Sequence, residues 1–262
     1  MSTTVEDFVD VGTLDCALDG GASSRAAIGL IVLATDQTME LEFRTLVPTD
    51  GVALYCTRVL NDVEITPDTL RAIVPRIAPA TELIMPGSPL DVVAFGCTSA
   101  TMTVGEDAIF AEIRKIRPGV ACTTPVTAAF AAFKALGARR IGVLTPYEPS
   151  VNAIVRDYLN QHGAEVAAFG TFNKIDDREA ARITLDSVAE GVATLAAATE
   201  LDAVFVSCTS IRLSERVAEM EEATGLPVTS SDHAMAWHCL RLAGIDDIVQ
   251  DAGRLFTLRA VD

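Results

Sequence analysis

Basic residues are scarce in this chain of 262 residues, which carries 20 Lys and Arg against 36 Asp and Glu and has a formal net charge of −16. Nucleic acids and anionic membranes bind basic surfaces, so this charge argues against both as partners. No apolar run approaches the ~20 residues of a membrane span. The acidic start MSTTVEDFVD also lacks the basic and apolar regions of a signal peptide. We therefore expect a cytoplasmic protein.

Cysteine pairs of the C-x-x-C type are absent, although the chain has six cysteines. In a reducing compartment this pattern disfavours disulfides and structural zinc. Histidine is rare too, and His233 and His238 lie five residues apart, not the four that place two ligands on one helix face. The sequence thus predicts no metal site and leaves reduced thiols free to act as acids, bases or nucleophiles.

One apolar stretch occurs twice, as LDVVAFGCTSATM at residues 90–102 and LDAVFVSCTSIRL at residues 201–213. Six of the ten residues at 90–99 are identical to those at 201–210. Each copy is typical of a buried parallel strand. Each ends on a cysteine followed by Thr and Ser, and a helical pattern comes next. The repeat indicates a duplicated α/β unit with one thiol in each half.

The remaining pattern alternates between strands and helices after a polar arm at residues 1–24. Further strands are predicted at 27–35, 52–59, 119–124, 139–147, 164–172 and 226–230. Helices are predicted from Asp36, over 67–85 with proline breaks, and at 105–116, 125–137, 151–162, 178–198, 214–224 and 233–244. The fold class is therefore α/β, with two pseudo-symmetric, doubly wound, flavodoxin-like parallel sheets facing each other across a cleft.

The predicted domain boundary lies near Pro125. We expect an N-terminal α/β domain at residues 1–124 and a C-terminal α/β domain at 125–231. The last helical region, 232–262, is expected to pack back onto the first domain. The 111-residue separation of Cys97 and Cys208 matches the 113 residues between the two Ile-Gly strand openings, which supports this division.

Cys97 and Cys208 are the candidate catalytic residues. The carboxyl ends of parallel strands face the crevice where open α/β sheets bind ligands. Helix starts there would lower a thiol pKa and hold a substrate carboxylate. Two opposed thiols can act as base and acid, or as nucleophile and proton donor, without a metal or cofactor. Four hydroxyl side chains would add hydrogen-bond donors: Thr98, Ser99, Thr209 and Ser210.

Longer stretches carry a family resemblance. The strand ends GCTS and SCTS, with IGLIVLATDQTMELEF and LTPYEPSVN, resemble the Asp/Glu racemase superfamily, in the branch of maleate cis–trans isomerase and arylmalonate decarboxylase. TPVTAAFAAFKALGARRIGVLTPY and SSDHAMAWHCLRLAGI resemble the isomerase-like protein of ectoine utilisation. The resemblance covers nearly all of the chain after about residue 25. It implies a cofactor-free enzyme, assembled as a homo-oligomer, that holds a small carboxylate substrate between Cys97 and Cys208.

Two positions refine what the resemblance implies. Maleate isomerases carry Pro-Ser-Ser-Asn where this chain has Leu-Ala-Thr-Asp ending at Asp36. An ionised Asp36 would repel a dicarboxylate and pair with an ammonium group, as the corresponding Asp does in amino-acid racemases; it can also cap the next helix. Tyr147 matches an isomerase tyrosine that hydrogen-bonds substrate, and can equally be a core aromatic. Asp176 and Asp177 lie near another substrate-binding position, with no role assigned.

The sequence thus predicts a cofactor-independent, two-cysteine isomerase or racemase for a small, amino-substituted carboxylate, and the resemblance points to ectoine or hydroxyectoine catabolism. Three alternatives stay open. In a maleate-type cis–trans isomerase, Cys97 would add to the alkene while Cys208 handles the proton. An arylmalonate-type decarboxylase needs Cys208 alone, and members of that type keep only the second cysteine. A non-catalytic protein would bind the carboxylate without converting it.

Overall fold

The computed structural model describes residues 9–62, 66–174 and 176–261. Within these residues, two four-stranded sheets have all their paired strands parallel. The first has the order β2-β1-β3-β4 and the second the order β6-β5-β7-β8. The strands are β1 (Ala26–Leu33), β2 (Val52–Val59), β3 (Val92–Gly96), β4 (Ala121–Thr123), β5 (Arg140–Thr145), β6 (Glu165–Thr171), β7 (Ala203–Val206) and β8 (Val228–Ser230). The identical order in both halves confirms the predicted fold class.

Helices connect successive strands. In the first half they are α1 (Met39–Leu46), α2 (Pro67–Arg71), α3 (Val74–Glu82), α4 (Thr98–Val104), α5 (Glu106–Ile116) and α6 (Pro125–Leu136). In the second half they are α7 (Pro149–Gln161), α8 (Asp177–Ala180), α9 (Leu185–Ala198), α10 (Val217–Thr224) and α11 (Ser231–Leu242), with 3₁₀ turns η1 (Ser214–Arg216) and η2 (Arg254–Thr257).

Three helix predictions need correction. The helix expected from Asp36 begins at Met39, because Asp36 caps its first turn from outside. The helix expected over 178–198 is two helices, because Thr184 accepts a hydrogen bond from the backbone N–H of Ser187 and starts α9 afresh. The segment 67–85 is likewise divided into α2 and α3, although Pro79 lies inside α3 and does not end it.

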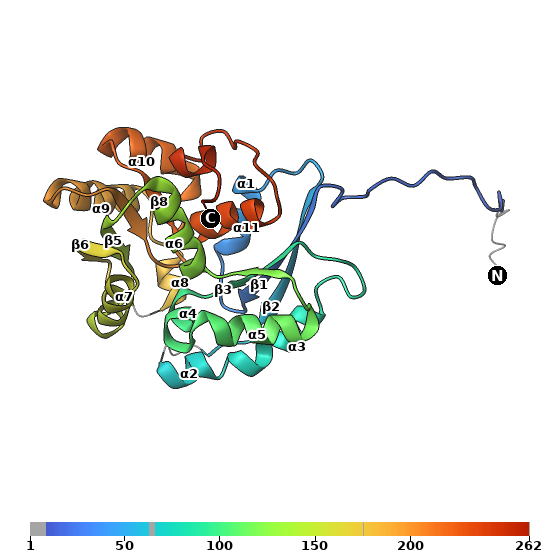
Figure 1. Cartoon of the computed structure of the whole chain (residues 1–262), viewed down its shortest axis with the longest axis horizontal. Coiled ribbons are helices and arrows are strands. Elements are labelled where there is room, and N and C mark those ends of the chain that lie inside the picture. The colour runs from blue at the N-terminus through green and yellow to red at the C-terminus, as the bar shows by residue number, and fades with distance from the viewer. Residues whose placement is uncertain (1–8, 63–65, 175, 262) are drawn as a thin grey trace, which may run out of the picture.

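Both faces of the first sheet are covered, which explains why β1 is buried at all eight positions. Ile28 and Val32 point to the core that includes residues of α1, α6 and α11. Ile31 and Leu33 point to the opposite core, with residues of α2, α3 and α5. Figure 1 shows α3, α4 and α5 along one side of this sheet and α11 on the other. The predicted site residues Cys97 and Cys208 lie just beyond the carboxyl ends of β3 and β7.

Helix α6 belongs to two cores, whereas α11 belongs to one of them. Ala128 and Ala132 of α6 pack with the first sheet, whereas Val126 and Phe133 pack with the second. Helix α11 is buried at every position except its last, Leu242, and packs with residues of β1 and α1. The division at residues 124 and 125, just before α6, stays a prediction.

The N-terminal arm has no helix or strand over its described residues 9–24 and projects away from the body (Figure 1). Residues 1–8 of the predicted arm lie outside the described part. Among the described residues, no helix is both long enough and apolar enough to span a bilayer.

Candidate active site

Both repeated cysteines open onto one pocket at the carboxyl ends of the two sheets, with a cavity volume of about 30 Å³. Cys97 follows β3 in the first sheet and Cys208 follows β7 in the second, so one thiol comes from each half. The other lining residues are Leu33, Asn61, Asp62, Thr69, Leu70, Ile73, Thr98, Ser99, Tyr147, Asp177 and Thr209. The pocket lies between the two halves, and a small substrate there would meet both thiols.

Cys97 is the N-cap of α4, and its Sγ accepts a hydrogen bond from the backbone N–H of Ala100 at 3.4 Å. The Ser99 hydroxyl lies 3.6 Å from the same sulfur. These donors favour the thiolate, but burial outweighs them and raises the pKa of Cys97 to about 11. The helix start therefore does not give the unliganded protein a low-pKa thiol, contrary to the sequence prediction.

Cys208 is placed differently, because no helix starts there. Its Sγ accepts from the backbone N–H of Ser210 at 3.3 Å, and regular structure resumes only in η1 at Ser214. The predicted helix start at this cysteine is wrong. Burial and the negative charge of Asp177 raise the pKa of the Cys208 thiol well above its usual range, although a hydrogen bond from Tyr147 opposes this. Both thiols are therefore protonated at neutral pH in the free protein.

Six of the eight predicted site residues line the pocket: Cys97, Thr98, Ser99, Tyr147, Cys208 and Thr209. Asp36 and Ser210 are not among its lining residues. Ser210 reaches the site through its backbone N–H, which is bonded to Cys208. The Thr98 hydroxyl is 3.0 Å from the Ser231 hydroxyl of α11. Thr98 is therefore hydrogen-bonded to α11 as well as lining the pocket.

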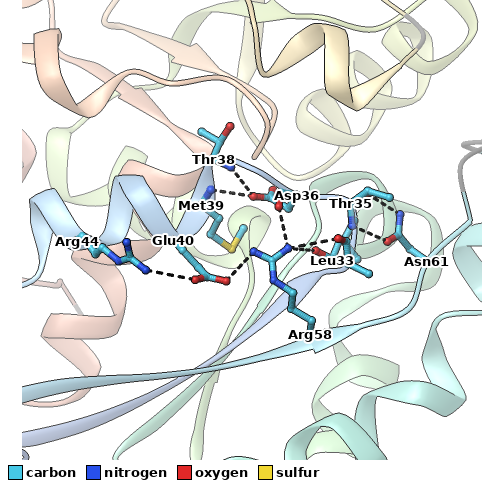
Figure 2. A network of polar contacts seen from close by, with 10 residues as sticks. Leu33, Thr35, Asp36, Thr38, Met39, Glu40, Arg44, Arg58 and Asn61 are labelled. Carbon is cyan, nitrogen blue, oxygen red and sulfur yellow. Dashed lines mark hydrogen bonds and ion pairs between the residues drawn. The ribbon is translucent and has the colours of Figure 1, made fainter.

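Asp36 is only 5% exposed, and its Oδ1 accepts from the backbone N–H groups of Thr38, the N-cap of α1, and of Met39, its first residue, at 2.8 Å each (Figure 2). Its Oδ2 is buried and has no hydrogen-bond partner. Burial raises the pKa of Asp36, and the capping N–H groups and Arg58 counteract this only in part. One carboxylate oxygen of Asp36 therefore holds the start of α1, and the other is buried without a partner.

Arg58, which the sequence reasoning did not single out, holds the turn between β1 and α1. Its guanidinium donates to the backbone oxygens of Leu33, Ala34 and Asp36 and forms a 2.7 Å ion pair with Glu40 (Figure 2). The available signal was an arginine one residue before the end of a predicted strand, since strands of parallel sheets are mainly apolar.

Asp177 is the site residue whose role the sequence left unassigned. It begins α8, lines the pocket beside Tyr147 and Cys208, and is close enough to Asp36 for their charges to interact. Burial and the charge of Asp36 raise the pKa of Asp177, while the Ser210 side chain opposes this by hydrogen bonding. The signal in the sequence was the family resemblance, which placed Asp176 and Asp177 near a substrate-binding position without assigning a role to either.

The segment after Cys208 is clamped by α1 of the other half. Glu42, 1% exposed, accepts from the backbone N–H groups of Leu213 and Ser214 at 3.1 and 2.9 Å, and from the Ser214 hydroxyl. The Thr38 hydroxyl donates to the backbone oxygen of Ser210 at 3.1 Å. Polar groups of the first half thus fix the loop that carries the second thiol.

A sequence model of the arylmalonate decarboxylase family matches residues 28–256. The chain belongs to this family. Among its curated relatives, arylmalonate decarboxylase of Bordetella bronchiseptica is 27% identical over 208 residues, covering 76% of this chain and 86% of that protein. Maleate isomerase of Nocardia farcinica is 26% identical over 239 residues, covering 87% and 94%. The relatives of this chain therefore include a decarboxylase as well as isomerases.

Solved structures share the family fold. One is a cysteine-to-serine mutant of Nocardia farcinica maleate cis–trans isomerase with a covalently bound succinylcysteine intermediate. It superposes with a TM-score of 0.78 at 24% identity, covering 88% of this chain and 98% of the other. This likeness establishes the two-sheet fold for the family member described here.

Proposed function

We propose that this chain is a cofactor-independent isomerase that removes and returns a proton beside the carboxylate of a small substrate. The observation that carries the proposal is the placement of Cys97 and Cys208, one from each half, in a single pocket with Tyr147. Membership in a family with a decarboxylase and isomerases among its relatives supports it. Isomerisation needs both thiols, whereas decarboxylation needs one proton donor.

The proposed reaction starts with one cysteine as thiolate and the other as thiol. The thiolate takes the proton from the carbon next to the carboxylate, and the C–H electron pair moves onto the carboxylate oxygens. The opposite thiol then donates its proton to the other face of that carbon and becomes the thiolate. The amide groups at the start of α4 and the Tyr147 hydroxyl would stabilise the transient negative charge.

The acidic residues favour a substrate that also carries an ammonium group. Asp177 lines the pocket, and Asp36, whose charge acts on Asp177, has an unpartnered oxygen. Burial is the main cause of the raised pKa of Cys208, and the Asp177 charge adds to it. A bound ammonium would offset that charge and would thereby lower the pKa of the thiol. An amino acid or an ectoine-derived diamino acid, as the sequence resemblance suggests, has this combination of groups.

A maleate-type cis–trans isomerisation is the second candidate, favoured by the isomerase relatives. In it the Cys97 thiolate adds to one alkene carbon, and the other carbon takes a proton from Cys208. Rotation about the resulting single bond precedes loss of that proton and of the Cys97 sulfur. The succinylcysteine intermediate of the Nocardia farcinica enzyme supports covalent chemistry of this kind.

Incubation of candidate amino acids and of maleate with the protein in deuterated water tests the proposal. We expect deuterium beside the carboxylate with the wild-type protein and with Cys56→Ser, an exposed cysteine outside the pocket that serves as the matched control. Cys97→Ser and Cys208→Ser should each slow the exchange by about 10²–10⁴-fold.

Full exchange activity in both single variants would overturn the proton-transfer proposal. Fumarate formed from maleate, with no exchange into amino acids, would favour the second candidate. Carbon dioxide release that survives Cys97→Ala would indicate a decarboxylase. Tight binding of a carboxylate with no exchange and no product would indicate a binding protein.

A further inference from the structure

The N-terminal arm has the composition of a strand that packs against another surface. Its four large apolar side chains are between 72% and 91% exposed: Val9, Val11, Leu14 and Leu18. At residues 14–19 the sequence LDCALD alternates apolar residues with acidic or small ones, which is typical of a strand with one buried face. Over its described residues, however, the arm forms no strand and projects away from the body (Figure 1).

Strand β2 has an open edge that could accept such a strand. Among the described strands it pairs only with β1, along all eight of its residues. A long edge of this kind offers unpaired backbone N–H and C=O groups to a further strand. Leu54 and Tyr55 are half-buried on opposite faces of β2, and Cys56 is exposed beside them. Leu60, just beyond the strand, is 67% exposed. A further strand along β2 would cover these side chains.

The charges of the arm and of the β2 edge are complementary. The arm carries three aspartates and no basic residue over residues 9–24. The side chains whose charges act on Cys56, in the middle of β2, are two positive and one negative: Arg44, Arg58 and Glu40. Arg58 pairs with Glu40 at 2.7 Å, whereas Arg44 lies 3.7 Å from it and is 73% exposed. In a chain of net charge −16, this edge therefore attracts an acidic segment.

We propose that the arm of one copy of this chain adds as a strand along the open edge of β2 in a second copy, which returns its own arm in the same way. Residues 9–24 span about 50 Å when extended, roughly twice the length of β2. Each arm starts beside this edge, because the backbone N–H groups of Arg25 and Ala26 donate to the backbone oxygen of Gly51, the residue before β2. The exchange therefore closes on itself as a two-fold pair.

The other long edge strand, β6, is a poorer acceptor for the arm. It belongs to the second sheet, so an arm that docked there would join copies head to tail into an open chain. Its pairing with β5 also shifts register between Ile141 and Gly142, an irregularity that protects an edge from further pairing. The pairing of β2 with β1 has no such shift.

The two exposed cysteines test the exchange, because Cys16 lies in the arm and Cys56 on β2, while the other four cysteines are buried. Full-length Cys16→Ser and Cys56→Ser proteins are mixed and treated with a short bis-maleimide, which adds one thiol at each end. Neither variant alone can link Cys16 to Cys56, so this link in the mixture joins two copies. We expect mass spectrometry of the peptides to find it in greater yield than Cys16–Cys16 or Cys56–Cys56.

Sedimentation equilibrium of the full-length chain and of Leu18→Asp provides a second measurement. Leu18 is 91% exposed, so the substitution leaves the core of the single chain intact. Loss of its burial against β2 should weaken the dimer at least about tenfold. Thr13→Asp adds the same charge to the arm without removing an apolar side chain, and should change the dissociation constant less than about threefold. In a dilute, dissociated sample the arm adds nothing to the stability of the single chain.

Four results would overturn the proposal. The first is a full-length chain that stays monomeric at every concentration, and the second is a dimer that is equally stable without residues 1–20. The third is a link between Cys16 and Cys56 that forms in the wild-type protein but not in the mixture, because the arm would then lie along β2 of its own chain. The fourth is an equal loss of affinity in Thr13→Asp and Leu18→Asp, which would contradict burial of Leu18.

Discussion

At the scale of single residues, burial is the main influence on whether the two cysteine thiols of the site are protonated. Cys97 and Cys208 each accept a backbone N–H, which favours the thiolate, yet burial keeps the pKa of both thiols above the usual value. Tyr147 is the side chain whose hydrogen bond lowers the pKa of Cys208, and burial keeps its own pKa well above the usual value, so it remains a donor.

Tyr147→Phe should therefore slow alkylation of Cys208 and leave Cys97 nearly unchanged. Loss of one hydrogen bond to a charged acceptor corresponds to about a tenfold smaller thiolate fraction at a fixed pH. The measurement is the rate at which iodoacetamide alkylates each cysteine, followed by its peptide, at pH 8.5–9.5 (from the usual thiol pKa to about one unit above it). Equal slowing of both cysteines would instead indicate a general change of the pocket.

Asp232 of α11 provides a second prediction at this scale. It is completely buried, neither carboxylate oxygen has a hydrogen-bond partner, and burial with the nearby charges of Asp36 and Glu42 raises its pKa well above the usual value. A carboxyl with a raised pKa disfavours folding once pH exceeds the pKa of the unfolded chain, near 4.

Asp232→Asn should accordingly lie within about 0.5 kcal/mol of the wild-type free energy of unfolding near pH 4, where the folded carboxyl is neutral and about half of the unfolded one is ionised. The variant should become more stable than wild type as the pH rises, by about 1–3 kcal/mol at pH 8. Urea unfolding curves at pH 4, 6 and 8 provide the measurement. A difference that is independent of pH would mean that Asp232 does not titrate as described.

At the scale of elements, the chain takes a different course after each of the two cysteines. After Cys97 it continues directly into α4, whereas the five residues after Cys208 form an irregular loop held by Glu42 of α1. A side chain at Gly96, just before Cys97, would displace Met39, because an added Cβ would overlap the end of the Met39 side chain. The matching residue before Cys208 is Ser207.

Removing the clamp tests whether it positions the second thiol. Glu42→Ala should lower kcat for deuterium exchange at least about tenfold, because loss of one partner leaves buried N–H groups unsatisfied and frees the loop. Glu42→Gln keeps an acceptor oxygen and should recover most of kcat, while Glu82→Ala, an exposed helical glutamate, should have no effect. Loss of stability in Glu42→Ala with kcat unchanged would show a structural role alone.

At the scale of the whole molecule, the C-terminal region joins elements that are distant in sequence. Phe256 and Leu255 are fully buried in the core around β1 and α11, and the Trp237 ring N–H donates to the backbone oxygen of Leu258. The backbone N–H of Arg254 donates to Glu221 of α10, in the other half. The N-terminal arm makes no comparable contribution over its described residues, where its large apolar side chains are exposed.

Changes at the two ends of the chain should differ in their effect on the free energy of unfolding. Phe256→Ala is expected to lower the free energy of unfolding by about 3–5 kcal/mol, because it leaves a cavity in a closed core. Deletion of residues 1–20 should change it by less than about 0.5 kcal/mol. Urea unfolding of both proteins checks this, and comparable destabilisation by the deletion would show that the arm packs on the body.

Local sequence pattern was sufficient to predict the two parallel sheets, the repeated α/β unit and the placement of Cys97 and Cys208 at strand ends. These features depend on short apolar runs and local turn signals, which can be recognised residue by residue. Three-dimensional packing was needed to show that Asp177 joins the pocket, that Glu42 holds the loop after Cys208, and that both thiols have raised pKa values. Desolvation and contacts between the halves depend on side chains that come together from distant elements. No local sequence pattern encodes which of these side chains meet.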